Sequence, residues 1–173
     1  MEAVRIGGGD LDALERAFDA VKYGRLSEPP HLDLRIPTVS SPELAPPGHH
    51  VVSILVSFAP YELAGGWTEE RREALGEAVV AALEVHAPGV RERLVAREVL
   101  APPDLEERYG TTGGHLHHGE HALDQLFTLR PAPFAARYAT PVPGLFLAGS
   151  GSHPGGGVTG LPGWLAAGTI LAG

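Results

Sequence analysis

The sequence predicts an α+β fold with a mixed sheet that contains a β-α-β unit, and two observations point to this class. The first is the longest helical pattern in the chain, which lies between strand-like runs at residues 51–58 and at about residues 91–100. The second is a succession of apolar strand, glycine-rich loop and helix from residue 145 onward. With 173 residues, 43% of them hydrophobic, the chain is long enough to bury one core.

The first third of the chain is predicted to contain one helix and two strands. Asp10 can cap a short helix whose apolar residues share one face and are expected in the core, namely Leu11, Leu14, Phe18 and Val21. Prolines then disfavour helix from residue 26 to residue 48, although HLDLRIP at residues 31–37 alternates as a strand does. Residues 51–58 form a mostly apolar, β-branched run that is typical of a central strand.

The strongest helix signal begins at Thr68. Glu69 and Glu70 suit the positive end of a helix dipole, and Pro88-Gly89 ends the pattern. The residues of this helix that are expected to be buried are Leu75, Val79, Ala82, Leu83 and His86. Further along the chain, residues 102–104 are expected to open a short helical turn and residues 114–118 to form a strand edge.

The charge and hydropathy of the chain argue against two kinds of partner, nucleic acid and the interior of a membrane. The formal net charge is −8, and the thirteen basic residues are scattered among carboxylates, whereas nucleic acid needs clustered Lys and Arg. We therefore expect no nucleic-acid partner. No apolar run approaches the roughly 20 residues of a membrane span, and the N-terminus lacks a signal-peptide pattern. These features predict a cytoplasmic chain with no membrane span.

Four histidines gather in one short stretch: His115, His117, His118 and His121. On a strand, His115 and His117 would share a face, and His121 could supply a third nitrogen to zinc. However, the stretch has no HExxH frame, no carboxylate at a clear ligand spacing and no distant fourth ligand. The chain also lacks cysteine. We therefore predict that no metal is bound.

The segment from residue 145 to residue 167 reads LFLAGSGSHPGGGVTGLPGWLAA, with seven glycines between Gly149 and Gly163. Because glycine has no side chain, the main chain of such a loop can approach a flat or anionic ligand closely. The helix that follows directs free N–H groups toward whatever lies over the loop. An ordinary exposed turn is the alternative. Ser152-His153 has no GxSxG frame, which argues against a hydrolase.

The segment YATPVPGLFLAGSGSHPGGGVTGLPG, residues 138–163, resembles the C-terminal flavin-contacting signature of the phytoene desaturase and carotenoid isomerase-type oxidoreductases. GGHLHHGEHALDQLFTLRP, residues 113–131, is similar to the segment before that signature. Residues 14–61 resemble the middle of such proteins, especially of the pyridine nucleotide-disulfide oxidoreductase-like branch. One departure is Trp164-Leu165, which stands where many relatives carry a polar residue.

The resemblance implies that the complete protein binds FAD. The residues expected to contact FAD are Gly149, Ser150, Gly151, Gly155, Gly156, Gly157 and Val158. The resemblance places the histidine stretch near the substrate side of the flavin. It leaves two roles open for Asp124 and Arg130, which either line the flavin site or form an ion pair that ties a loop to the core. No catalytic residue is assigned.

The dinucleotide-binding fingerprint of such proteins is not found in this sequence. The glycines at residues 7–9 follow too short a strand, and a GxGxxG frame that starts at Gly149 has Pro154 in its sixth position. We therefore predict the C-terminal portion of a larger FAD-dependent oxidoreductase. Residues 1–137 are then the distal part of the substrate domain, and residues 138–173 return to the flavin domain.

The implied activity of the complete protein is oxidation, desaturation or isomerisation of an apolar substrate, a class that includes isoprenoids, by hydride transfer to FAD. Alone, the chain is expected to be inactive and to retain no FAD. Its expected partners are the missing N-terminal flavin-binding half or a second copy of itself. The alternative is a stand-alone, non-enzymatic domain that acts by self-association or by binding a small ligand.

Overall fold

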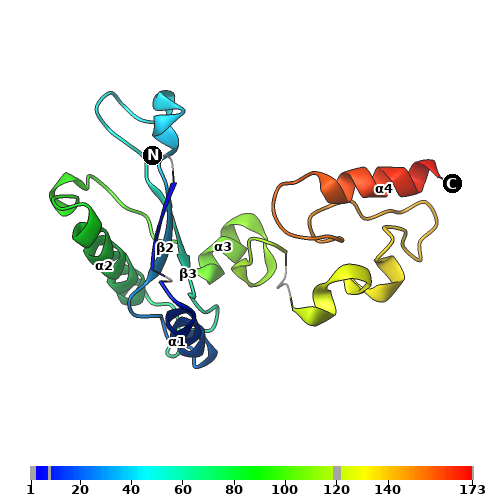
Figure 1. Ribbon diagram of the computed structural model, residues 1–173, viewed down its shortest axis with the longest axis horizontal. Coiled ribbons are helices and arrows are strands. Elements are labelled where there is room, and N and C mark those ends of the chain that lie inside the picture. The colour runs from blue at the N-terminus through cyan, green and yellow to red at the C-terminus, as the bar shows by residue number, and fades with distance from the viewer. Residues whose placement is uncertain (1–2, 8, 119–121, 173) are drawn as a thin grey trace. The chain divides into compact units, whose positions relative to one another are not determined.

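The computed structural model describes residues 3–7, 9–118 and 122–172, and the chain divides into two compact units, residues 1–103 and residues 104–173. Figure 1 shows the sheet and the longest helix in the first unit, and mostly short turns in the second. This division lies well before residue 137. The boundary predicted there concerns the domains of a complete oxidoreductase, and it stays a prediction.

The first unit contains a three-stranded antiparallel sheet. Its strands, β1 (Ala3–Ile6), β2 (His31–Arg35) and β3 (Ser53–Ser57), lie in the order β1-β2-β3. Leu32 of β2 pairs with Ile6 on one side and with Val56 on the other. The strands β2 and β3 lie where alternation and β-branching predicted them, so the α+β class agrees with the structure. The sheet is antiparallel, however, and not mixed.

The strand expected at residues 91–100 does not form, and the predicted β-α-β unit is therefore absent from the described first unit. A 3₁₀ turn at Arg91–Arg93 is followed by residues without regular structure. Side chains hold this segment in place. Arg97 pairs with Glu73 and Glu77 of the preceding helix, and Val99 packs against the core. The segment is held by contacts with α2 and the core instead of by pairing with a neighbouring strand.

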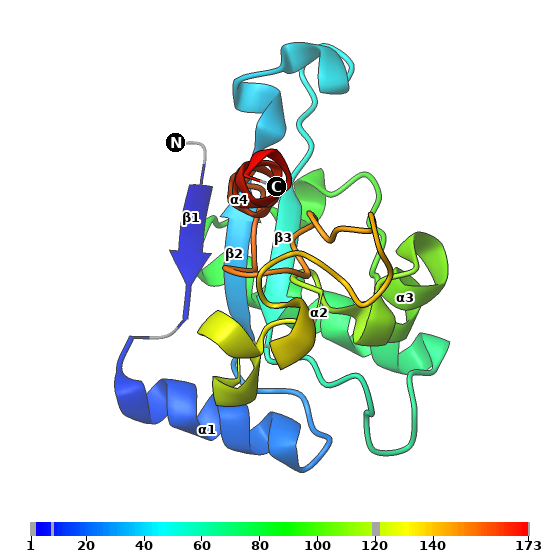
Figure 2. The same ribbon diagram turned by 90° about the vertical axis from the view of Figure 1, so that its right-hand side faces the viewer.

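Helix α2 (Glu69–His86) packs along one face of the sheet (Figures 1 and 2). Its N-cap is Thr68, the residue at which the sequence predicted the start of the helix, and the Thr68 hydroxyl accepts a hydrogen bond from the Arg71 amide. Leu75 and Val79 join Leu32 of β2 in the core, and Ala82 and Leu83 pack beside them. His86, expected in the same stripe, is exposed because it lies in the last turn of the helix, beyond the sheet.

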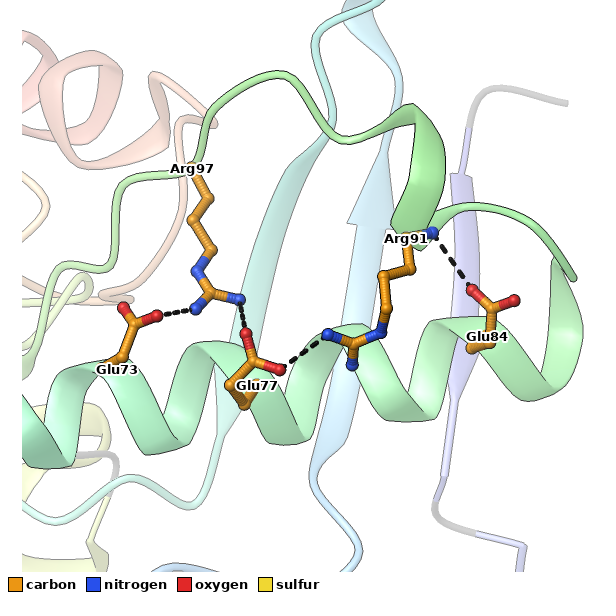
Figure 3. A network of polar contacts seen from close by, with 5 residues as sticks. All are labelled: Glu73, Glu77, Glu84, Arg91 and Arg97. Carbon is orange, nitrogen blue, oxygen red and sulfur yellow. Dashed lines mark hydrogen bonds and ion pairs between the residues drawn. The ribbon is translucent and has the colours of Figure 1, made fainter.

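The opposite side of α2 carries a network of ion pairs (Figure 3). Glu77 accepts hydrogen bonds from Arg91 and Arg97, and Arg97 also pairs with Glu73 one turn earlier. Between these two carboxylates lies the buried Gly76, where an added Cβ would come within 3.1 Å of Arg97 Nε and Val99 Cγ2. The bare glycine thus lets the irregular segment lie directly against the helix.

Helix α1 (Leu11–Lys22) begins as predicted, with the Asp10 carboxylate accepting from the Ala13 amide at 2.6 Å. The prediction that the large apolar residues of this helix lie in the core is wrong. Leu11 is 82% exposed and Phe18 is 59% exposed, whereas Ala17 is buried. The helix lies at the end of the sheet, where β1 leads into it (Figure 2), and its alanine side faces the rest of the unit.

In the second unit, the regular elements are α3 (Pro102–Tyr109), whose first two residues belong to the first unit, and α4 (Leu161–Leu171). Short 3₁₀ turns connect them. The strand expected at residues 145–148 is reduced to a single bridge between Ala139 and Phe146, and residues 114–118 form turns instead of a strand edge. A strand needs a neighbour, and the described part of this unit offers only that bridge. No helix among the described residues is long and apolar enough to cross a membrane.

Candidate functional site

A buried arginine organises the second unit. Arg130 is 1% exposed, and its guanidinium Nη2 donates to the carbonyl oxygens of His117 at 2.9 Å, His118 at 3.3 Å and Ser150 at 3.4 Å. A buried cation is tolerated when hydrogen bonds replace its hydration. One side chain thereby holds the histidine stretch beside the glycine-rich loop. Two roles were predicted for Arg130: to line the flavin site, or to tie a loop to the core through an ion pair. The observed geometry is closer to the second role, although the groups that Arg130 binds are main-chain oxygens.

The glycine-rich loop is built around this guanidinium. Gly155 has φ of +82°, and a Cβ there would lie 2.6 Å from Arg130 Nε, so only glycine fits. The Tyr138 hydroxyl donates to the His153 carbonyl at 3.0 Å, and burial raises the pKa of Tyr138 above its usual value. The phenol therefore keeps its proton and remains a donor. Together, Arg130 and Tyr138 fix the first half of the loop.

The second half of the loop leads into α4 past a histidine. The Gly157 amide donates to His117 Nδ1 at 3.3 Å, across 40 positions of sequence. Because Nδ1 accepts, the proton of the neutral imidazole is on Nε2. Thr159 Oγ1 then accepts from the Leu161 amide at 3.2 Å, where the helix begins. The histidine stretch therefore lies beside the loop, whereas its predicted place on the substrate side of the flavin stays a prediction.

Two glycines of the loop have no steric reason to be glycine within this chain. An added Cβ at Gly149 would meet nothing within 4 Å, and at Gly151 it would meet only His118 Cβ at 3.9 Å. Neither residue has the positive φ that side chains disfavour. Nothing among the described residues therefore requires glycine at these two positions.

The remaining candidates differ in accessibility. Ser150 is half-buried and contributes its carbonyl oxygen to Arg130, while Gly156 has a left-handed backbone with φ of +56°. Val158 is fully exposed. Sequence reasoning did not foresee that Tyr138 supports the loop, because a hydroxyl that reaches a carbonyl 15 positions away leaves no local pattern.

The histidines contact each other and the loop rather than surrounding a common point. The His115 and His117 rings lie edge to face with centroids 5.9 Å apart, and the His117 amide donates to His115 Nδ1. Among the described residues, no three His, Asp or Glu side chains are placed to hold a metal ion. His121, the third predicted ligand, lies outside the described residues.

No protein-family model matches the chain. Individual proteins do match, and over most of its length. The chain is 42% identical to the mouse pyridine nucleotide-disulfide oxidoreductase domain-containing protein 2 over 171 residues, which are 98% of the chain and 29% of the mouse protein. It is 30% identical to a neurosporene-forming phytoene desaturase of Cereibacter sphaeroides over 84% of the chain and 27% of that enzyme.

A carotenoid 3,4-desaturase of Haloarcula japonica is 32% identical over 72% of the chain and 24% of that protein. The chain therefore spans less than a third of the length of the relatives it matches. These matches confirm the resemblance seen in the histidine stretch and the glycine-rich loop. As a segment, the chain belongs to the phytoene desaturase-type oxidoreductases, in the branch of the pyridine nucleotide-disulfide oxidoreductase domain-containing proteins.

Proposed function

We propose that the chain supplies the flavin-contacting loop of an FAD-dependent oxidoreductase that takes hydride from an apolar substrate, isoprenoids being one such class. The names of the relatives support the reaction class, since they are desaturases and an oxidoreductase domain-containing protein. Because the chain covers only 29% of its mouse relative, the activity belongs to a complete protein. The chain alone is expected to be inactive.

The observation that carries this proposal is the unexplained bareness of Gly149 and Gly151. Gly155 is required by Arg130 inside the chain, but these two glycines have room for a side chain. Glycine where nothing in the protein requires it is consistent with close approach of a flat ligand to the main chain. The residues available for that approach are Gly149 to Gly151 at the start of the loop and Gly156 to Val158 further along it.

The loop also has suitable electrostatics for such a ligand. When bound, FAD would supply the hydride acceptor at its isoalloxazine ring. The first turn of α4 directs its partial positive charge toward the loop, which favours negative charge there. His117 fixes the Gly157 amide, so this part of the main chain is held before a ligand arrives. Arg130 places a full positive charge beneath Gly155.

A chimaera tests the proposal. This chain would replace the matching 29% of the mouse relative, and FAD would be measured by visible absorbance after desalting. We expect the chimaera to retain FAD and the 173-residue chain alone to lose it, because the dinucleotide-binding unit is outside this chain. Gly149→Val in the chimaera should abolish retention while the melting temperature of the FAD-free protein is kept. Unchanged retention in that variant would contradict a flavin-contacting loop.

A second candidate is a domain that acts without FAD by self-association or by binding a small ligand. The observation that favours it is the exposure of large apolar side chains in the second unit, including Trp164 at 73% and Phe134 at 72%. Such side chains usually mark a surface that is covered by a partner. In this case the chimaera would fold without retaining FAD, so the same experiment separates the two candidates.

A further inference from the structure

A cavity of about 840 Å³ lies wholly within the first unit, far along the sequence from the glycine-rich loop. Its walls are the inner side of α1, the connection from α1 to β2, the start of β2 and the first turns of α2. Small-molecule pockets in proteins usually enclose roughly 300–1,000 Å³. The cavity therefore has the size of a ligand site, and the flavin proposal assigns it no role.

Small residues keep the cavity open. Three of the residues that α1 contributes to the lining are alanines, namely Ala13, Ala17 and Ala20. Gly24 and Ala64 also line the cavity and are joined by a hydrogen bond from the Ala64 amide to the Gly24 carbonyl at 2.8 Å. Turning Leu11 and Phe18 inward would have buried more apolar surface. The helix instead presents alanines to the cavity and leaves both large side chains in solvent.

The lining is cationic in an otherwise acidic chain. Arg16, Arg25 and Arg71 line the cavity, against the single carboxylate of Glu28, whereas the whole chain has a net charge of −8. Two of the three guanidinium groups are held in place. Arg71 Nη1 donates to the Ala64 carbonyl at 2.5 Å, and the Arg25 guanidinium lies over the Tyr23 ring. Arginine side chains recognise carboxylates through paired hydrogen bonds.

A buried histidine adds a hydrogen-bonding group to this wall. His31 is 8% exposed and packs edge-on against Phe58 with ring centroids 5.3 Å apart. Gly7 passes so close that a Cβ there would lie 3.1 Å from His31 Nδ1. Within the described residues, no hydrogen bond is made to the His31 ring, so the imidazole can serve a polar group inside the cavity.

We propose that this cavity binds an amphipathic carboxylate, with its apolar body along the alanine side of α1 and its carboxylate among Arg16, Arg25 and Arg71. The apolar body fits walls made of alanine and leucine, and the excess of two positive charges over Glu28 selects an anion. The site is independent of the proposed flavin loop, which lies in the other unit.

The test uses the 173-residue chain and cis-parinaric acid, a fluorescent polyene carboxylate. We expect saturable binding at one site per chain, competition by dodecanoate, and competition by dodecanol that is at least about tenfold weaker, because a charge-assisted hydrogen bond is lost. Dodecyl phosphate distinguishes a carboxylate site from a general anion site. Equal competition by dodecanoate and dodecanol would overturn the proposal, and preference for the phosphate would overturn the carboxylate assignment.

Variants locate the site. Ala17→Leu places a larger side chain in the cavity and should abolish binding, whereas Ala81→Leu, on the exposed side of α2, is the matched control. If Ala17→Leu does not fold, the double variant Arg16→Gln/Arg25→Gln decides the question, with Arg93→Gln as its control. We expect the double variant to bind the probe at least about tenfold more weakly. Unchanged affinity in it would place the probe elsewhere. Gly149→Val, which tests the flavin loop, should leave probe affinity unchanged.

Discussion

Among the described residues, each unit buries one large side chain completely, and one of the two side chains is apolar while the other is charged. In residues 1–103 it is Leu32, and in residues 104–173 it is Arg130, each 1% exposed. Leu32 lies in an apolar cluster between a sheet and a helix, whereas Arg130 gathers main-chain carbonyl oxygens. Apolar burial stabilises in proportion to area, but a hydrogen bond gains little net free energy over its bond to water. The first unit is therefore organised around an apolar cluster, whereas the most buried large side chain of the second unit is held by hydrogen bonds.

The largest effect is expected from removing the apolar centre of the first unit. Leu32→Ala should lower the free energy of unfolding by about 3 kcal/mol, since it deletes buried methyl groups and leaves a void. Urea unfolding followed by circular dichroism measures this. Leu11→Ala, at an exposed position of α1, should change stability by less than about 0.5 kcal/mol. Equal effects of both substitutions would mean that the unit has no core at Leu32.

The matching substitution in the second unit is Arg130→Met, which keeps the side-chain length and removes the donors. Carbonyl oxygens of His117 and His118 would lose their bonds to a buried cation, at a cost of about 2 kcal/mol. Hydrogen exchange should show faster exchange of the Gly157 and Ser152 amides, with β2 amides unchanged. The exposed Arg137→Met is the control. Faster exchange throughout β2 would show that the two units do not open separately.

Within the loop, two glycines should separate structure from ligand contact. Gly155→Ala must displace the Arg130 guanidinium and adopt a positive φ, so we expect about 1–2 kcal/mol of lost stability. Gly149→Ala should change stability by less than about 0.5 kcal/mol because its surroundings are open. Thermal melting of both variants decides this. A comparable loss at Gly149 would show that this residue is also structural, and would remove the main support for the flavin proposal.

The smallest effect is expected from the ion pairs on α2. Hydrogen bonds from Arg91 and then from Arg97 hold the pKa of Glu77 below its usual value of 4.5. A carboxylate whose pKa is depressed on folding contributes stability above its unfolded pKa, and this is lost as the pH falls through the lowered value. Glu77→Gln should therefore lower the melting temperature slightly at pH 7, and this difference should shrink as the pH falls below 4.5. Glu92→Gln serves as the exposed control. A constant difference across this pH range would exclude the ion pair as its cause.

Local patterns in the sequence predicted the elements whose causes are local. The caps at Asp10 and Thr68, the strands β2 and β3 and the final helix all follow from residues within a few positions. The failures have non-local causes. Helix α1 turns Ala17, and not Leu11, toward the rest of the unit, and Arg97 ties the segment at residues 94–101 back to α2.

The candidate site divides in the same way. The glycine-rich loop could be found from composition alone, since seven glycines lie between residues 149 and 163. Its attachment could not, because Arg130, Tyr138 and His117 meet the loop across 15 to 40 positions of sequence. A resemblance to known proteins placed the histidine stretch near the substrate side of the flavin, which stays a prediction. Only the distances in the structure separate a glycine that the fold requires, such as Gly155, from one that has room for a side chain, such as Gly149.

Gly76 has a consequence for attempts to make this chain more robust. Replacing a helical glycine with alanine is a common engineering choice, because glycine in a helix interior costs roughly 1 kcal/mol relative to alanine. In α2 this exchange would push against Arg97 and Val99, which lie 3.1 Å from the position of the new methyl group. The residue that looks weakest by helix propensity is thus the one that lets the segment after α2 rest against the helix. A library of stabilising variants should leave it unchanged and vary the exposed alanines of the same helix.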